Sequence, residues 1–142
     1  MTVEDILAQV TLFSELSRRD LKRLAAGAIS RNFAKGDIIV KEGEQATAFY
    51  LMCSGRAEVV KGVEGSSPRV LGILKAGDFF GDMALLDGYL RSATVRALED
   101  TQCLVLSRWD FLAELRASPF IAAQMLPVLS RRLREAEAQL TT

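Results

Sequence analysis

The spacing of hydrophobic positions changes twice along this chain and divides it into three parts. In residues 1–30 the apolar positions fall on helical faces, at Leu7, Val10, Leu21, Leu24 and Ala28. Ser17, with Asp20 three residues later, has the pattern of a capping box. The pattern predicts a helix from about residue 18 to residue 28, within an N-terminal part that is helical throughout.

Residues 31–107 contain short apolar runs, rich in β-branched side chains and separated by turns that contain glycine. The runs are residues 38–40, 49–52, 57–60, 70–74, 93–97 and 103–106. Many short strands with glycine turns predict a sandwich or a barrel. Gly36-Asp37 and Gly77-Asp78 each precede an apolar pair, which suits a jelly roll of two related halves. Chance repetition of a common turn explains this echo nearly as well.

Alternation within one run predicts which of its faces is buried. Phe49, Leu51 and Cys53 alternate with Tyr50, Met52 and Ser54. We therefore expect one core face and one mixed face. Cys53 and Cys103 both lie in apolar runs and are interpreted as small buried hydrophobic residues in a reducing compartment. A redox pair is the alternative interpretation.

The C-terminal part, residues 108–140, returns to helical spacing. Residues 109–115 predict a short helix, and Ser118 predicts the N-cap of a second helix, with Pro119 at its first position. Pro127 is expected to kink that helix or to end its first part. The apolar seam of this helix steps by three and four residues through Leu126, Leu129, Leu133, Ala136 and Leu140. The seam suits packing on the domain's own sheet, a dimer interface or a lid over a ligand.

Composition narrows the class of protein. A length of 142 residues suits one domain, and 49% hydrophobic residues exclude a disordered chain. Eighteen basic residues balance eighteen acidic ones, so no overall positive field favours nucleic acid or an anionic membrane. The start of the chain, with Glu4 and Asp5 and no basic residue before Arg18, is not a secretory signal. The longest uncharged run, residues 117–130, is shorter than the ~20 residues of a membrane span, so we expect a soluble cytoplasmic protein.

Candidate chemistry for an enzyme is missing from this composition. The chain has no histidine, which argues against imidazole-based metal sites and against haem held by a proximal histidine. Two cysteines are too few for a four-cysteine iron–sulfur cluster. No pair of nucleophile and base is visible in the sequence. We therefore expect that the protein is not an enzyme and that it binds no metal ion and no cofactor.

Residues 80–95 read F-G-D-M-A-L-L-D-G-Y-L-R-S-A-T-V and carry the strongest functional signal. The free N–H groups and the dipole at a helix start attract a phosphate. Gly81 has no Cβ to keep a ligand away, and Arg91 can direct two N–H donors to two phosphate oxygens. Asp82 can accept hydrogen bonds from a ribose hydroxyl. This stretch can hold one small anion that carries a sugar.

The stretch resembles the phosphate-binding cassette of the cyclic nucleotide-binding domain family, whose usual form is F-G-E-(Leu/Met)-A-L-L, a short gap and Pro-Arg-(Ala/Ser)-A-T-V. Asp82 stands where the family usually has Glu, and Leu90 stands where Pro is common. The resemblance extends over nearly the whole chain. It implies a mainly β fold with flanking helices: an N-terminal helical bundle, an eight-stranded β jelly roll, and two C-terminal helices. Residues 1–142 would then form one domain, with residues 1–30, 31–107 and 108–140 as its parts.

The family's roles transfer to matching positions. The resemblance implies that Arg91 anchors the phosphate and that Ser92 adds a hydroxyl and an N–H. Gly81 and Asp82 would meet the ribose 2′-hydroxyl, although Asp82 also suits a helix N-cap. The backbone N–H groups of Met83 and Ala84 would face the same place, while their side chains join the core. The remaining candidates are Val70, Leu71 and Ile73, which either wall the base or belong to a strand core.

The resemblance implies a regulatory sensor that binds cAMP or cGMP and relays occupancy through its C-terminal helices. A threonine at position 92 tends to favour cGMP in the family, whereas Ser92 is compatible with cAMP, so we expect cAMP over cGMP. The moving part would be a hinge between Ser107 and Pro119. The alternative is a structural or dimerisation domain that keeps the fold without the ligand. A homodimer through the seam helix is a candidate protein contact. We expect no binding to a membrane and no nucleic acid bound by the chain itself.

Overall fold

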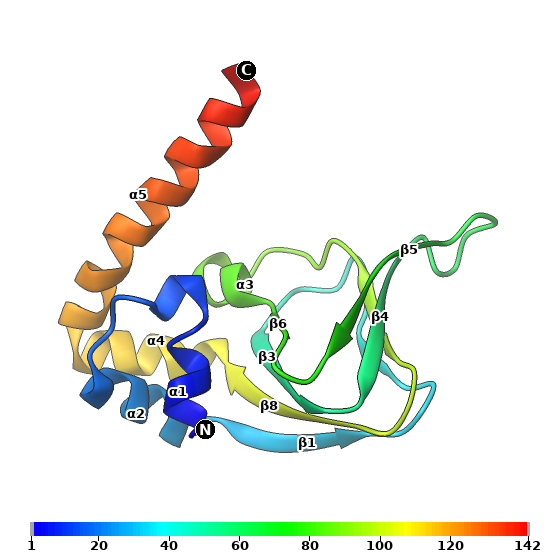
Figure 1. The fold of residues 1–142 in the computed structure, drawn as a ribbon, viewed down its shortest axis with the longest axis horizontal. Coiled ribbons are helices and arrows are strands. Elements are labelled where there is room, and N and C mark those ends of the chain that lie inside the picture. Colours follow the sequence, from blue (N-terminus) through cyan, green and yellow to red (C-terminus); the bar gives the residue numbers. More distant parts are fainter. Residues whose placement is uncertain (1, 142) are drawn as a thin grey trace. The chain divides into compact units, whose positions relative to one another are not determined.

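The computed structural model describes residues 2–141, which divide into two compact units. One unit, residues 28–109, holds the β-strands, and the other combines residues 1–27 with residues 110–142. Figure 1 labels the elements of both. The eight strands are β1 (Ile29–Phe33), β2 (Ile38–Val40), β3 (Ala48–Ser54), β4 (Arg56–Lys61), β5 (Arg69–Lys75), β6 (Phe79–Phe80), β7 (Thr94–Ala97) and β8 (Thr101–Ser107).

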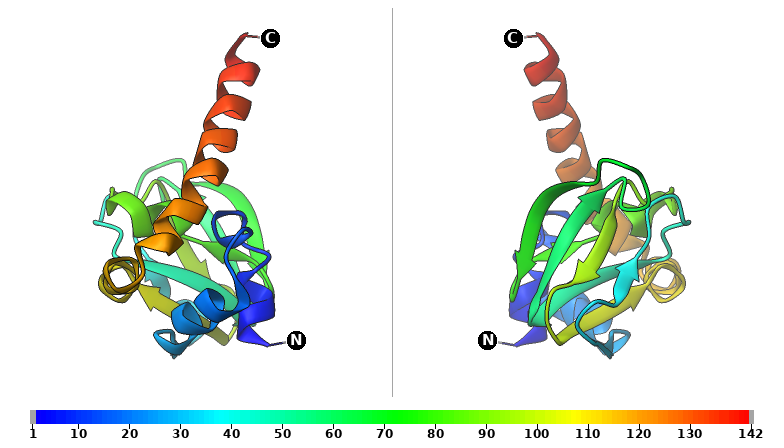
Figure 2. Two further views of the ribbon diagram at one scale, coloured as in Figure 1. Left: turned by 90° about the vertical axis from the view of Figure 1, so that its left-hand side faces the viewer. Right: turned by 90° about the vertical axis from the view of Figure 1, so that its right-hand side faces the viewer.

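The strands form two antiparallel sheets of four. One sheet has the order β1-β8-β3-β6 and the other the order β2-β7-β4-β5, so neighbours in space are rarely neighbours in sequence. The right-hand view of Figure 2 shows the second sheet with β5 at its outer edge. This arrangement is the predicted eight-stranded jelly roll. The first strand begins at Ile29, so the predicted helix that was to run to Ala28 ends earlier.

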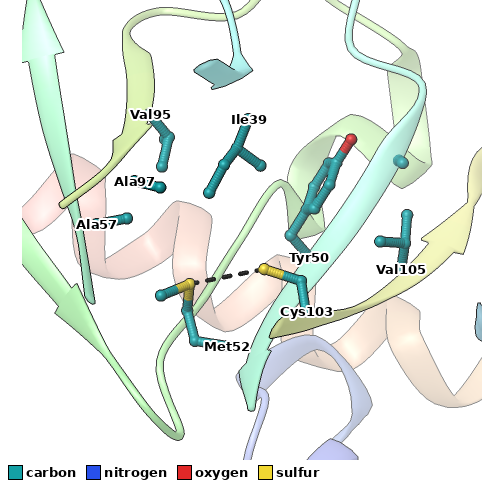
Figure 3. Packing of buried hydrophobic residues seen from close by; sticks show 9 residues of the cluster. Ile39, Tyr50, Met52, Ala57, Val95, Ala97, Cys103 and Val105 are labelled. Carbon is teal, nitrogen blue, oxygen red and sulfur yellow. Dashed lines mark hydrogen bonds between the residues drawn. The ribbon is translucent and has the colours of Figure 1, made fainter. Parts of the chain in front are cut away.

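The core of this unit lies between the two sheets. Figure 3 shows Ile39, Ala57, Val95 and Ala97 of one sheet meeting Tyr50, Met52, Cys103 and Val105 of the other. All of them are buried, and the sulfur atoms of Met52 and Cys103 lie 3.8 Å apart. These inward positions alternate along β3 and β8, as the period of a strand requires.

The prediction of one core face and one mixed face on β3 is wrong. Phe49, Tyr50, Leu51 and Met52 are all buried, because β3 lies inside its sheet and its outer face contacts α3 (Asp82–Asp87). Cys53 is exposed, so the prediction that both cysteines are buried holds for Cys103 alone. Cys53 is the second-last residue of β3, where the burial of the strand ends.

The other unit contains α1 (Val3–Leu7), the 3-10 helix η1 (Thr11–Phe13), α2 (Arg18–Ala26), most of α4 (Arg108–Ala117), and α5 (Pro119–Thr141). Ser17 caps α2 as predicted, since its hydroxyl accepts a hydrogen bond from the backbone N–H of Asp20 at 3.2 Å. The rings of Phe13 and Phe111 lie 6.2 Å apart in its core. Within residues 2–141, no helix has the length and apolar character that a bilayer span requires.

Helix α5 carries two apolar stripes. Ile121, Met125 and Val128 are buried, and α5 packs on η1. Leu126, Leu133 and Leu140 of the predicted seam are exposed instead, so the interpretation that the seam packs on the domain's own sheet is wrong. The helix continues through Pro127, so of the two predicted alternatives, a kink or an end of its first part, the second is wrong. Pro127 and Ala123 are both exposed, so the carbonyl that lost its donor can reach water.

Candidate functional site

The helix α3 begins with a backbone conformation that glycine favours. Gly81 follows β6 and is the N-cap of α3, with a φ of 86° in the left-handed region. Gly88 ends the same helix with a φ of 64°. Since Gly81 occupies the cap, Asp82 is the first residue of the helix, and the alternative that Asp82 is the N-cap is wrong.

The segment that carries Arg91 is held by the chain before β3. The backbone N–H of Arg91 donates to the carbonyl of Glu44 at 2.8 Å, and the carbonyl of Arg91 accepts from the N–H of Gly43 at 2.9 Å. Leu90 forms an isolated bridge with Gln45. These contacts fix the backbone of Arg91 relative to β3, although Leu90 replaces the usual proline.

The Arg91 side chain lies against β3. Its Nη2 donates to the carbonyl of Ala48 at 2.7 Å, and its guanidinium carbon lies 5.7 Å from the centre of the Tyr50 ring. Tyr50 in turn stacks on Phe80, with ring centres 4.9 Å apart and planes 4° from parallel. Burial lowers the pKa of Arg91 from its ordinary value, and the neighbouring Tyr50 opposes that shift. The guanidinium is thus a partly desolvated cation with a neutral carbonyl as its hydrogen-bond partner.

Gly81 and Arg91 approach each other so closely that a side chain at position 81 would not fit. A Cβ on Gly81 would lie 2.7 Å from the carbonyl oxygen of Ala48 and 2.7 Å from Nη1 of Arg91. Both distances are shorter than ordinary contacts between such atoms. Glycine at this position therefore allows Arg91 to lie beside the N-terminus of α3.

A cavity of about 360 Å³ lies at this point of the β unit. The six candidate ligand residues line it: Gly81, Asp82, Met83, Ala84, Arg91 and Ser92. One side of the cavity is thus the start of α3, where backbone N–H groups lack helical partners. The other polar side is the guanidinium of Arg91. Such a cavity can hold an anion between a helix N-terminus and a cation.

The three residues predicted as a base wall lie outside the cavity. Val70, Leu71 and Ile73 are about half exposed on β5, and none of them lines the cavity. They do not form a strand core either, because β5 is the last strand in its sheet and has one neighbour. The apolar lining comes instead from Val40, Val59 and Val95 on β2, β4 and β7. None of these three valines was predicted from the sequence, although each lies in a β-branched run.

The remaining candidates differ in their exposure. Ala84 is buried as expected, whereas Met83 is 45% exposed, so the prediction of a core side chain is wrong for Met83. Ser92 is exposed, and its carbonyl accepts a hydrogen bond from Nζ of Lys61 at 3.1 Å. Lys61 of β4, which was not predicted from the sequence, adds a second positive charge near the cavity. No group of acidic, cysteine or histidine side chains suited to a metal ion occurs among residues 2–141.

Comparison with known proteins agrees with this geometry. The chain is 40% identical over 110 residues to the cyclic AMP receptor protein of Thermus thermophilus, covering 78% of this chain and 51% of that protein. It is 41% identical over 108 residues to the cAMP-dependent protein kinase regulatory subunit of Debaryomyces hansenii, covering 76% of this chain and 23% of that one. The chain spans about half or less of the length of these two relatives.

A solved structure covers nearly the whole chain. The N-terminal domain of a transcriptional regulator from Streptomyces coelicolor aligns with 96% of this chain and 95% of its own, at a TM-score of 0.86 and 26% identity. A model of the cyclic nucleotide-binding domain matches residues 30–118, which include every strand from β2 to β8 and the cavity. The sequence, the jelly roll and the cavity therefore lead to one conclusion: this chain belongs to the cyclic nucleotide-binding domain family.

Proposed function

We propose that this protein is a regulatory sensor that binds a cyclic nucleotide in the cavity beside α3. The observation that carries the proposal is the Arg91 guanidinium, which is partly desolvated and lies beside Gly81 at the cavity wall. A cyclic phosphate diester carries one negative charge, and a desolvated guanidinium that can donate two hydrogen bonds suits it. Asp82 would accept from the ribose hydroxyl, and Val40, Val59 and Val95 would contact the base.

We propose cAMP as the preferred ligand. Ser92 supports this preference. It lines the cavity, and the position holds a serine and not the threonine that tends to favour cGMP in the family. The names of the relatives from Thermus thermophilus and Debaryomyces hansenii both refer to cAMP. cGMP is the alternative ligand, and the calorimetric titration described below compares the affinities of the two nucleotides.

The C-terminal helices are proposed to carry the response, with residues 1–142 acting as one sensor domain. The exposed seam on α5 supports a homodimer as part of this function. Leu126, Leu133 and Leu140 are between 62% and 88% exposed, although leucine side chains gain free energy when they are buried. A second copy of the chain would cover them through its own α5. The competing proposal is a domain that forms dimers without a ligand, and the exposed leucines of α5 favour that proposal as well.

Isothermal titration calorimetry of cAMP, and then cGMP, against the wild type and Arg91→Ala tests the proposal. We expect the wild type to bind with a micromolar or lower Kd. Loss of a charged partner costs about 2–5 kcal/mol, so Arg91→Ala is expected to weaken binding by about 30-fold to several thousand-fold.

The matched control is Arg69→Met, which changes an exposed arginine on β5 away from the cavity. It is expected to bind as the wild type does. Equal affinity of Arg91→Ala and wild type would contradict the assignment of Arg91. Absence of binding to both nucleotides, in folded protein free of copurified ligand, would favour the dimerisation domain.

A further inference from the structure

A β-turn between β2 and β3 brackets the backbone of Arg91. The turn spans residues 41–44, and the N–H of Glu44 donates to the carbonyl of Lys41 at 3.2 Å. Gly43 is its third residue and has a φ of 87°, which is typical of a type II turn. The N–H of Gly43 donates to the carbonyl of Arg91, and the carbonyl of Glu44 accepts from the N–H of Arg91. The conformation of this turn therefore determines where the backbone of Arg91 lies.

Glu42, the second residue of this turn, is tied to two strands of the second sheet. Its N–H donates to Oγ1 of Thr94 at 3.0 Å, and Thr94 is buried at the start of β7. Its carboxylate oxygen Oε1 accepts from the N–H of Gly62 at 2.9 Å, and Gly62 directly follows β4. A carboxylate that accepts from a backbone N–H makes a charge-assisted hydrogen bond, which is stronger than a neutral one. Glu42 thus holds the turn at the end of β4.

Lys61, the last residue of β4, makes a second link from the same place. Its Nζ donates to the carbonyl of Ser92, the residue directly after Arg91, at 3.1 Å. The end of β4 is therefore connected to the phosphate-binding segment twice, through Glu42 with its turn and through Lys61. Glu42 does not line the cavity, so it makes no contact with a ligand held there. Its influence on a ligand passes through the residues that it holds.

We propose that Glu42 is a positioning residue that holds Arg91 in place for a phosphate. This inference rests on the proposed function, because it assigns Glu42 to the geometry of the same site. An arginine that donates two hydrogen bonds to a phosphate needs a defined position, and small displacements at such a site weaken binding strongly. Leu90 makes this restraint necessary, since it stands where the family commonly has proline and has no ring to fix the backbone before Arg91.

Calorimetric titration of cAMP against the wild type, Glu42→Met, Glu42→Gln and Glu64→Met tests the proposal. Glu42→Met keeps the length of the side chain and removes the acceptor, so we expect binding to weaken by about tenfold. Glu42→Gln keeps an acceptor oxygen for the N–H of Gly62 and should bind within about threefold of the wild type. Glu64→Met is the matched control: it removes a carboxylate from the loop after β4 that pairs with the exposed side chain of Lys41 at 2.9 Å, and it should bind as the wild type does.

The same substitutions in an Arg91→Lys background distinguish the positioning of Arg91 from a general loss of structure. Lysine keeps the positive charge but cannot donate two parallel hydrogen bonds to a phosphate. If Glu42 acts through the geometry of Arg91, Glu42→Met should weaken cAMP binding by about threefold or less in that background, against about tenfold in the wild type. A merely structural role would lower the affinity by the same factor in both backgrounds.

The outcomes separate this inference from the proposed function. A lack of cAMP and cGMP binding by the wild type contradicts the proposed function, and the inference fails with it. Binding by the wild type with unchanged affinity of Glu42→Met overturns the inference alone, as does an equal loss in both backgrounds or a loss in Glu42→Gln as large as that in Glu42→Met. If Glu42→Met does not fold, Glu42→Asp carries the same test, because its carboxylate is one methylene shorter. We expect it to weaken binding by about threefold or more, and wild-type affinity overturns the proposal.

Discussion

At the scale of single residues, the site depends on a close approach between Gly81 and Arg91. The glycine has a φ of 86°, and the guanidinium lies where a Cβ would allow too little space. Backbone conformation and the position of the cation are therefore linked at one point. Gly81 therefore differs from glycines that only allow a turn, because it also leaves space for the Arg91 guanidinium.

Gly81→Ala is expected to weaken nucleotide binding by about tenfold or more, since Arg91 must move away from the start of α3. The left-handed conformation also costs a non-glycine residue about 1–2 kcal/mol, so the free energy of unfolding should fall. Calorimetry and chemical denaturation measure the two effects.

Gly36→Ala is the matched control for this prediction. Gly36 has a φ of 91°, but a Cβ there would contact nothing within 4 Å. A similar loss of stability is expected, with unchanged nucleotide affinity. If Gly81→Ala bound nucleotide as tightly as Gly36→Ala, the close approach would not matter for binding.

The two cysteines are predicted to differ in reactivity. Cys53 is exposed, whereas Cys103 is buried in the core, and burial, aided by the neighbouring Cys53, raises the pKa of Cys103 to about 11. Because the thiolate is the reactive form, Cys103 should stay unreactive at a pH of about 8.

Titration with a thiol reagent measures this difference. We expect Cys53 to react in the native protein and Cys103 to react only after denaturation. Cys53→Ser is the control and should leave no thiol that reacts in the native state. Rapid labelling of Cys103 in that variant would show that the core between the sheets opens readily.

At the scale of elements, the two apolar stripes of α5 differ in burial. Ile121, Met125 and Val128 hold the helix on η1 of its own unit. The stripe through Leu126, Leu133 and Leu140 is exposed and remains available to a second copy. One helix can therefore be anchored to its unit and still present an interface.

Leu133→Glu is expected to weaken dimer formation by at least about tenfold, because each copy would place a charge where a leucine is buried. Sedimentation velocity at micromolar concentrations measures the association. Leu133→Met keeps an apolar side chain of similar size and should remain dimeric. A wild type that sediments as a monomer at these concentrations would contradict the proposed dimer.

The positions of the β-strands were largely predictable from the sequence, whereas their burial was not. Runs such as residues 38–40 and 57–60 were predicted at or within about two residues of β2 and β4, because their alternation and glycine turns are local features. The two-residue strand β6 was visible only as an apolar pair after a turn. Burial on both faces of β3 was not predictable, since it depends on α3 and on the order of strands.

At the scale of the whole molecule, the chain consists of a β unit that contains the cavity and a helical unit formed from both ends of the chain. Each unit has its own core, with Tyr50 and Met52 in the first and Phe13 and Phe111 in the second. Chain continuity connects them at Gly27 and at Trp109, directly after Arg108.

The sequence by itself determined the class of fold and which residue types lie together in the candidate site. Gly81, Asp82, Arg91 and Ser92 lie within a short stretch, so their types and spacing already indicate a place for a phosphate and a ribose. Glycine turns and alternating apolar runs likewise depend on neighbours in sequence. They predicted a sandwich or a barrel with helices at both ends, and the family resemblance implied the jelly roll.

Only the tertiary structure decided which residues far apart in sequence meet. It placed Val40, Val59 and Val95 in the cavity, and left Val70, Leu71 and Ile73 exposed on an edge strand. It also brought Arg108 to the end of α3 and turned Leu133 outward on α5. An apolar residue is equally suited to a core, a ligand or a partner. Its role therefore follows from strand order and helix packing, which depend on contacts between distant parts of the chain.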